Sequence, residues 1–424
     1  MQPTLAAATR FWLKLGFISF GGPAGQIAIM HRELVEQRKW IGESRFLHAL
    51  NFCMFLPGPE AAQLAIYIGW LLHGTPGGII AGALFVLPSV AILWGLSLLY
   101  ATYASLGWVA AIFYGLKAAV LAIVADALIR IARRSLKSPV FVVLAAASFV
   151  ALFFFNIPFP LVIVAAGLVG LAGGLMRLPS FMPPRDSAEP SVAYSEESRA
   201  RPSWGRSLKV VTLGLVLWWL PVIGAGLWLG WDNLLVKEGV FFSKAAMVTF
   251  GGAYAVLPYV AQLAVSKFGW LSASQMLSGL GLAETTPGPL IMVVLFVGFL
   301  AGWQHPAPLS PIGMATAGAL LTTWVTFVPC FMWIFVGAPF VERLYGNRML
   351  SGALAAITAA VVGVVANLAV WFGGHVLAPG GKLDVFALAM GLVVWAGLTR
   401  WKWNVVPVVI GAGLAGLAYW VAGL

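Results

Sequence analysis

The sequence predicts an all-α polytopic membrane protein, and two observations carry that prediction. Of its 424 residues, 61% are hydrophobic and only 9% are charged, and the mean hydropathy is +0.94. Soluble domains carry charges at about 25% of their positions, so this composition excludes an ordinary soluble fold. Apolar runs of about 17 to 25 residues, long enough to cross a bilayer as helices, recur along nearly the whole chain.

Loop signals divide the apolar runs into about thirteen hydrophobic segments. These are 11–30, 46–72, 77–103, 108–130, 139–155, 158–176, 208–230, 239–265, 271–302, 311–341, 350–373, 384–400 and 404–423. The long polar stretch at 177–207 is rich in Pro, Ser and charge, and it predicts a flexible loop. The first ten residues lack the basic and apolar regions of a signal peptide, so we expect no cleavage.

An internal repeat is visible at a constant offset of 230 residues. Residues 11–59 contain FWLKLGFISFGG, then a tryptophan, then PGP, and residues 241–289 contain FFSKAAMVTFGG with the same sequels. The matches are aromatics, glycines, prolines and a lysine, whereas chance agreement in apolar sequence involves mainly Leu, Ala and Val. After an insertion of about eleven residues, Pro88 matches Pro329 at an offset of 241. We interpret the pattern as a duplication.

The repeat divides the chain into four parts. They are a first repeat at 1–176, the polar loop at 177–207, a connecting transmembrane helix at 208–230 and a second repeat at 231–424. Six segments fall in each repeat, and the single connecting helix inverts the second copy. Inverted repeats with broken helices are typical of secondary transporters, whose substrate site lies near the midplane.

The basic residues predict the orientation, because cytoplasmic loops carry the excess of Lys and Arg. If all thirteen segments span, 16 of the 25 basic residues share the side of the N-terminus and 6 lie opposite. Loop 31–45 is the exception, since it adds four basic residues to the sparse side. If the first two segments of each repeat instead enter and return, the division becomes 19 against 3. We therefore predict re-entrant elements and a cytoplasmic N-terminus.

The PGP motifs predict breaks inside the apolar segments. Pro59 has no backbone N–H and Gly58 tolerates unusual dihedrals, so the helix stops there and a new half-helix begins with free N–H groups. Irregular backbone at membrane depth requires surrounding protein or a watery cavity. The N-terminus of a half-helix carries a partial positive charge that favours anions. Two such ends, after residues 57–59 and 287–289, suit a small dianion.

Several of these motifs together resemble the chromate ion transporter family in its two-domain form. They are FGGPAGQIAIM at 20–30, LPGPEAAQLAIYIGW at 56–70, LPS at 87–89, and FGGAYAVLPY and TTPGPL in the second copy. The resemblance covers both repeats. It implies an inner-membrane exporter of chromate that confers resistance, with sulfate as a competitor. The second copy departs from the first at Ala253 in place of Pro23 and at Leu290 in place of Glu60.

The lysines inside segments each have a functional and a structural interpretation. Lys14 and Lys244 occupy matching positions before FGG, and they either attract the anion or extend to the membrane interface. Lys117 lies near the middle of its segment, where a charge costs on the order of 3 kcal/mol, so it belongs either to the substrate pathway or to a structural partner. Its counterpart in the second repeat is Thr358.

The remaining polar candidates are also open between two interpretations. Glu60 and Glu284 either couple proton movement to transport or cap a half-helix. Ser19 and Thr249 either donate to oxyanion oxygens or bond back to a helix carbonyl. The predicted substrate-binding residues are Lys14, Ser19, Gly21, Gly22, Pro57, Gly58, Pro59, Lys117, Lys244, Thr249, Gly251, Gly252, Thr286, Pro287, Gly288 and Pro289.

Other classes of function find little support in the sequence. Dispersed basic residues without a nucleic-acid motif argue against nucleic acid as a partner, and the histidine spacing predicts neither a metal site nor an enzyme. We expect no cofactor, and no P-loop is present. The expected partners are chromate, sulfate as a rival oxyanion, and the lipid bilayer; the sequence leaves a homodimer open.

Overall fold

The structure is a computed structural model that describes residues 3–181, 204–340 and 348–423. Every regular element in these ranges is a helix, so the predicted all-α class is confirmed. Five helices, α4, α5, α8, α13 and α15, are long and apolar enough to cross a membrane. Most of the polar loop predicted at 177–207 lies outside the described residues.

The helices before the polar loop are α1 (Leu5–Ile18), α2 (Gly22–His31), α3 (Glu43–Met54), α4 (Glu60–Tyr103), α5 (Gly107–Ser135), α6 (Pro139–Phe153) and α7 (Phe159–Leu175). The connecting helix is α8 (Trp204–Leu229). The helices after it are α9 (Leu234–Met247), α10 (Ala253–Gln262), α11 (Ala273–Thr285), α12 (Val293–Gln304), α13 (Pro311–Gly337), α15 (Arg348–Leu377), α16 (Val385–Arg400) and α17 (Val405–Val421). Short turns η1 (Arg32–Gln37) and η4 (Leu263–Lys267) extend α2 and α10, and η5 (Leu290–Met292) precedes α12.

The first apolar segment of each repeat is a helical hairpin and does not continue straight. In the first repeat, the rings of Phe11 in α1 and Trp40, beyond α2, lie 5.4 Å apart. Phe241 and Trp270 make the equivalent contact at 5.6 Å. Residues so far apart on either side of the FGG motif can meet only if the chain reverses there. The reversal fits a hairpin that enters and returns, and its place in the membrane stays a prediction.

The second apolar segment also reverses. Around the first PGP motif, Phe52 of α3 lies 5.2 Å from Tyr67 of α4, ring to ring. α4 then reverses at His73 and Gly74, whose backbone is not helical, so that residues 60–72 and 75–103 are two antiparallel halves. In the second repeat, α12 and α13 form the same reversal with a longer connection, where the sequence carries its insertion.

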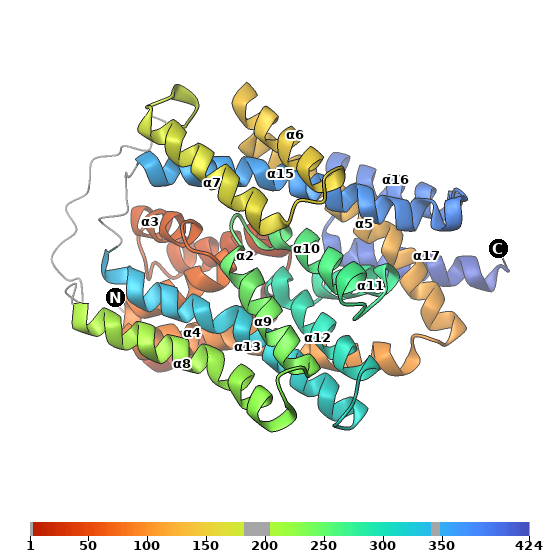
Figure 1. The fold of residues 1–424 in the computed structure, drawn as a ribbon, viewed down its shortest axis with the longest axis horizontal. Coiled ribbons are helices and arrows are strands. Elements are labelled where there is room, and N and C mark those ends of the chain that lie inside the picture. The colour runs from red at the N-terminus through yellow and green to blue at the C-terminus, as the bar shows by residue number, and fades with distance from the viewer. Residues whose placement is uncertain (1–2, 182–203, 341–347, 424) are drawn as a thin grey trace.

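Equivalent helices of the two repeats run in opposite directions. The second half of α4 packs on α13, with Gly82 against Phe331 and the Trp94 indole N–H donating to Thr316 Oγ1 at 3.1 Å. Residue numbers rise along one helix as they fall along the other, so these counterparts are antiparallel. The two ends of the chain accordingly lie at opposite ends of the molecule (Figure 1).

The helices form two layers. We call α5, α6, α7, α15, α16 and α17 the panel, because these six helices pack mainly on one another. We call α1–α4 and α9–α13 the hairpin layer, on whose outer side α8 packs against α9 and α13. Figure 1 shows α6, α7, α15 and α16 along the upper edge, α4, α8 and α13 along the lower edge, and α10 and α11 between them.

Candidate functional site

Four hairpin tips meet at the centre of the molecule. We call residues 19–22 and 249–252 the FGG tips, and residues 57–59 and 287–289 the PGP tips. The Gly58 N–H donates to the Thr249 carbonyl oxygen at 2.8 Å, and the Gly288 N–H donates to the Ser19 carbonyl oxygen at 2.8 Å. Both pairs join equivalent positions, so each PGP tip binds the FGG tip of the other repeat. Each PGP break therefore lies against the other repeat.

Glycine is required at the PGP tips for two reasons. Gly58 and Gly288 have φ of 129° and 108°, a region that other residues rarely adopt. A Cβ on Gly288 would lie 2.5 Å from Ser89 Cβ, and one on Gly58 would lie 2.9 Å from Cys330 Sγ. Ser89 and Cys330 follow the matched prolines of the two repeats, so the close approach is also duplicated.

Two glutamines support the PGP tips, and neither is among the binding residues predicted from the sequence. Gln26 donates from Nε2 to the Gly288 carbonyl at 2.5 Å, and Gln63 donates from Nε2 to the Pro57 carbonyl at 2.8 Å. Both side chains are fully buried, and the Oε1 atom of each has no hydrogen-bond partner among the described residues. A buried amide in an apolar helix was the available signal. The second repeat has valine at both equivalent positions, so neither glutamine belongs to the repeated pattern.

Helix N-termini surround the meeting point of the tips. A Cβ on Gly252, which precedes α10, would have Glu60 Oε1 at 3.8 Å and Pro23 Cγ at 3.9 Å as neighbours. Glu60 begins α4 and Pro23 lies in the first turn of α2, so three helices begin around this point. No side chain caps α2, α4 or α10, whereas Thr4 and Asn233 cap α1 and α9 at the outer ends of the hairpins. Uncapped N-termini leave backbone N–H groups for an anion.

The predicted hydroxyl donors are occupied by their own helices. Ser19 donates from Oγ to the Leu15 carbonyl at 2.6 Å, and Thr249 donates from Oγ1 to the Ala245 carbonyl at 2.7 Å. Thr286 likewise donates to a carbonyl one turn earlier. These contacts correspond to the back-bonding alternative of the sequence analysis, because each hydroxyl proton already has an acceptor. Backbone groups of these residues, not their hydroxyl groups, connect the tips.

The two candidate carboxylates have different surroundings. Glu60 is partly buried at the start of α4, and the charge of the Arg134 guanidinium acts on it from the end of α5. Glu284 is buried and accepts a hydrogen bond from the Tyr254 hydroxyl. The Arg130 guanidinium acts on Glu284 through its charge. Glu60 lies beside the FGG tip of the other repeat. Within the described ranges, no neutral donor makes a hydrogen bond to its carboxylate.

The three lysines inside segments lie in different places. Lys117 is partly buried in the middle of α5, and no hydrogen bond or ion pair of its ammonium group occurs within the described ranges. Its counterpart Thr358 lies against the second FGG tip, with Oγ1 3.8 Å from the position of a Cβ on Gly251. Lys244 is exposed on α9. Its counterpart Lys14 is 53% exposed and pairs with Glu33.

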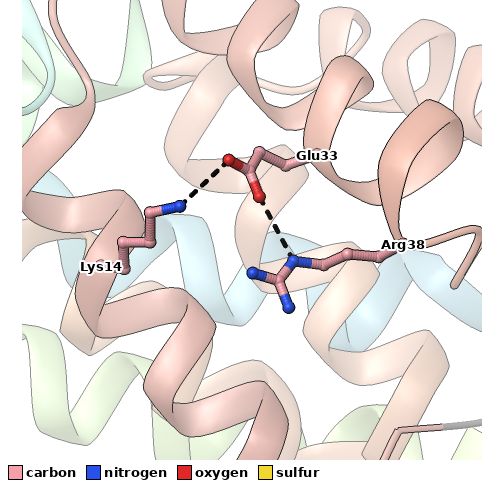
Figure 2. A network of polar contacts seen from close by, with 3 residues as sticks. All are labelled: Lys14, Glu33 and Arg38. Carbon is pink, nitrogen blue, oxygen red and sulfur yellow. Dashed lines mark hydrogen bonds and ion pairs between the residues drawn. The ribbon is translucent and has the colours of Figure 1, made fainter.

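Lys14 belongs to a network beside the first hairpin (Figure 2). Glu33 accepts from Lys14 Nζ at 3.2 Å and from Arg38 Nε at 3.3 Å. The second repeat replaces Glu33 and Arg38 with Leu263 and Phe268. The network thus links the outer end of the first hairpin to α1, and it has no equivalent in the second repeat.

This network predicts a pH-dependent contribution to stability. Burial raises the pKa of Glu33, but the hydrogen bonds and charges of Lys14 and Arg38 outweigh burial and hold it below its ordinary value of 4.5. A carboxyl with a lowered pKa in the folded state stabilises fully above its unfolded pKa, and that stabilisation is lost as the pH falls through the folded value. Glu33→Gln should therefore lose on the order of 1 kcal/mol at pH 7.

Thermal unfolding of the detergent-solubilised protein measures this effect. The difference between Glu33→Gln and the unaltered protein should shrink as the pH falls below about 4.5. Asp232→Asn is the control, because Asp232 is exposed and makes no hydrogen bond or ion pair within the described ranges. Equal unfolding temperatures at pH 7, or a difference that persists in acid, would contradict the assigned role of Glu33.

Chemistry other than binding has little support at this centre. Among the described residues, no group of three or more His, Cys, Asp or Glu side chains could hold a metal ion. Cys53 and Cys330 are buried and free. The arrangement offers uncapped N–H groups and one carboxylate, which suits reversible binding of an anion.

Comparison with known proteins gives consistent results. A family model described as "Chromate transporter" matches residues 6–171 and 237–417. A "Chromate transport protein" of Pseudomonas aeruginosa is 31% identical over 96% of this chain and 90% of its own length. Another from Cupriavidus metallidurans is 28% identical over 98% of this chain and 93% of its own, and a "Probable chromate transport protein" of Synechococcus elongatus is 29% identical over 98% and 96%. No solved structure matches the chain.

Proposed function

Because this chain belongs to the chromate transporter family, we propose that it exports chromate from the cytoplasm across the inner membrane and so confers chromate resistance. Membership of this family supports membrane transport of chromate, and it supports a transporter rather than an enzyme. Direction, resistance and mechanism are our inference. The repeats are the two units at 1–176 and 231–424, joined by the connecting helix.

The convergence of uncapped helix N-termini on the Gly252 region is the observation that carries this proposal. Chromate is a tetrahedral dianion, and backbone N–H groups at helix N-termini bind such ions. The binding site comprises both FGG tips and both PGP tips, and Lys117 supplies the cation. Lys14 and Lys244 act earlier, by attracting the anion to the outer ends of the hairpins.

We propose alternating access as the transport mechanism, with a proton as the coupling ion. Glu60 lies next to the site of a dianion, so its charged form repels the substrate and its protonated form does not. Proton binding at Glu60 therefore accompanies substrate binding, so the proton and the dianion cross together with one net negative charge, which the inside-negative membrane potential drives out of the cytoplasm. Glu284 has a lesser role, because the Tyr254 hydroxyl already stabilises its charge.

Accumulation of labelled chromate in inverted membrane vesicles tests this function. Vesicles that contain the protein should accumulate chromate when a proton gradient that is acid outside is imposed, because the proton and the dianion enter together, and excess sulfate should compete. Vesicles from the same strain without the protein are the control. Transport of sulfate with no transport of chromate would favour the rival oxyanion function. Absence of accumulation under every gradient would refute the assigned direction or substrate.

The orientation predicts which membrane face each hairpin reaches. Gln37 and Lys267 occupy equivalent positions at the outer ends of the first hairpins, and both are exposed. With a cytoplasmic N-terminus, a cysteine at position 37 should react with a membrane-impermeant maleimide only in inverted vesicles. A cysteine at position 267 should react only in intact cells whose outer membrane has been permeabilised. Labelling of position 37 from the periplasm would exclude the re-entrant arrangement.

A further inference from the structure

The panel covers the hairpins of one repeat only. α10 packs on α15, and α11 packs on α5, α15 and α17. In the described part of the chain, α2 and α3 have no comparable packing on any panel helix. The hairpins of the second repeat therefore pack on the panel, whereas the equivalent hairpins of the first repeat do not.

Solvent exposure shows the same difference at equivalent positions. Gly21, Ala24 and Ala28 are exposed along one face of α2, and Asn51 is exposed on α3. Their counterparts in the second repeat are at least partly buried, and they are Gly251, Tyr254, Pro258 and Gly281. The uncovered face of α2 runs from the first FGG tip to the outer end of its hairpin. It thus joins the centre to the N-terminal side of the molecule.

Two contacts between the panel and the hairpins occur in the second repeat. Leu116 of α5 presses against Gly281, where a Cβ would lie 1.9 Å from Leu116 Cδ2. Thr358 of α15 lies against Gly251. By the offsets of 230 and 241, the equivalent contacts would be Ile357 against Asn51 and Lys117 against Gly21.

We propose that the protein alternates between this structure and one in which the panel covers the hairpins of the first repeat. In that second state, Lys117 lies at Gly21 as Thr358 lies at Gly251 here, and Ile357 lies against Asn51. The panel helices separate from α10 and α11, so the centre opens on the side of the second repeat's hairpins and closes on the side that is open here. Because the repeats share one design, exchanging their roles needs no new kind of contact. The proposal rests on the alternating access proposed above.

In the proposed exchange, the ammonium group of Lys117 moves toward the first FGG tip. In this structure its ammonium group has no partner within the described ranges, although it is partly buried in a long apolar helix. A partly buried cation without a partner is costly, and it becomes favourable when an anion approaches it. Movement to Gly21 brings the cation to the uncapped start of α2. A bound dianion between them removes the repulsion, so the substrate favours closure of this side.

Disulfide cross-linking distinguishes the two states. The pair Leu116→Cys with Gly281→Cys reports this structure, since the cysteine at 116 removes the atoms that crowd position 281. The pair Asn51→Cys with Ile357→Cys reports the exchanged state. Cys53→Ala and Cys330→Ser remove the native thiols by introducing the residues that the other repeat carries, Ala283 and Ser89. Disulfides require Cα atoms within about 7 Å, so each pair forms only in its own state.

The full chain is reconstituted in liposomes, with a protease site inserted in the polar stretch 177–207, which separates the members of both pairs. Oxidation is done without chromate, because chromate itself oxidises thiols. After proteolysis, halves that stay joined on a non-reducing gel reveal a cross-link. We expect both pairs to cross-link, and either cross-link to abolish transport until reductant is added.

The outcomes separate this proposal from the proposed function. Cross-linking of 116 with 281 but never of 51 with 357, in protein that transports an oxyanion, would overturn the exchange. Cross-linking of both pairs in protein that transports neither chromate nor sulfate would leave the exchange intact and refute the substrate. If Ile357→Cys prevents folding, Val361→Cys replaces it, because its counterpart Val120 is the other α5 residue in contact with Gly281.

Discussion

Lys117→Ala should lower chromate transport roughly 10- to 100-fold, the largest loss expected from any single side chain beyond the hairpin tips. A hydrogen bond to a charged group contributes about 1.5–3 kcal/mol. Lys117→Ala removes such a bond between the ammonium group and the dianion, in a site without bulk water. Substrate binding and the movement of the panel both depend on this charge. Initial rates of chromate uptake into inverted vesicles measure the effect.

Matched variants separate the charge of Lys117 from its packing. Lys117→Arg keeps a cation and should retain part of the activity, whereas Lys117→Thr gives α5 the residue of its counterpart Thr358 and should be as inactive as alanine. Lys14→Ala should cost less than tenfold, because Lys14 is half-exposed and pairs with Glu33. The Lys117→Ala protein should elute as an intact species from size exclusion. If it then has full activity, Lys117 is not part of the binding site.

Glu60→Gln should abolish accumulation of chromate against its gradient while leaving exchange of chromate across the membrane. Glutamine resembles the protonated carboxyl in shape and charge, so the site still accepts the dianion but no proton can leave or bind. Accumulation driven by an imposed proton gradient and exchange of labelled for unlabelled chromate are measured on the same vesicles.

Glu60→Leu reproduces the residue of the second repeat, Leu290, and serves as the control for loss of polarity. We expect it to lose gradient-driven accumulation as well. Glu284→Gln should change accumulation less, because Tyr254 is the partner of Glu284 and not the substrate. Gradient-driven accumulation by Glu60→Gln at the rate of the unaltered protein would exclude Glu60 as the coupling residue and return attention to Glu284.

The sequence predicted the helical class and the two breaks at the PGP motifs. Pro59 and Pro289 each lack a backbone N–H and each lie inside an apolar run, so a broken helix follows from local chemistry alone. The offset of 230 residues, together with the charges of loop 31–45, also predicted hairpins that return. Local backbone rules and the positive-inside rule suffice for these features because neither needs knowledge of distant contacts.

The tertiary structure decided which groups meet and what each side chain does. Gln26 and Gln63 acquire their role only because the chain brings a carbonyl of a PGP tip to each of them. Ser19 and Thr249 present carbonyls to the other repeat while their hydroxyl groups stay in their own helices. Periodicity cannot distinguish these possibilities, since both uses fit the same residue at the same position.

The difference between the two repeats is likewise a property of packing and not of the repeated motif. Gly21 and Gly251 follow the same residue, Phe, and precede the same residue, Gly, yet one is exposed and the other lies against Thr358. A sequence specifies both arrangements when their free energies are close, and only the folded molecule shows which of them the panel has taken. The sequence alone therefore determined where the helices break. The contacts between distant helices decided which tips pair and which side of the centre is open.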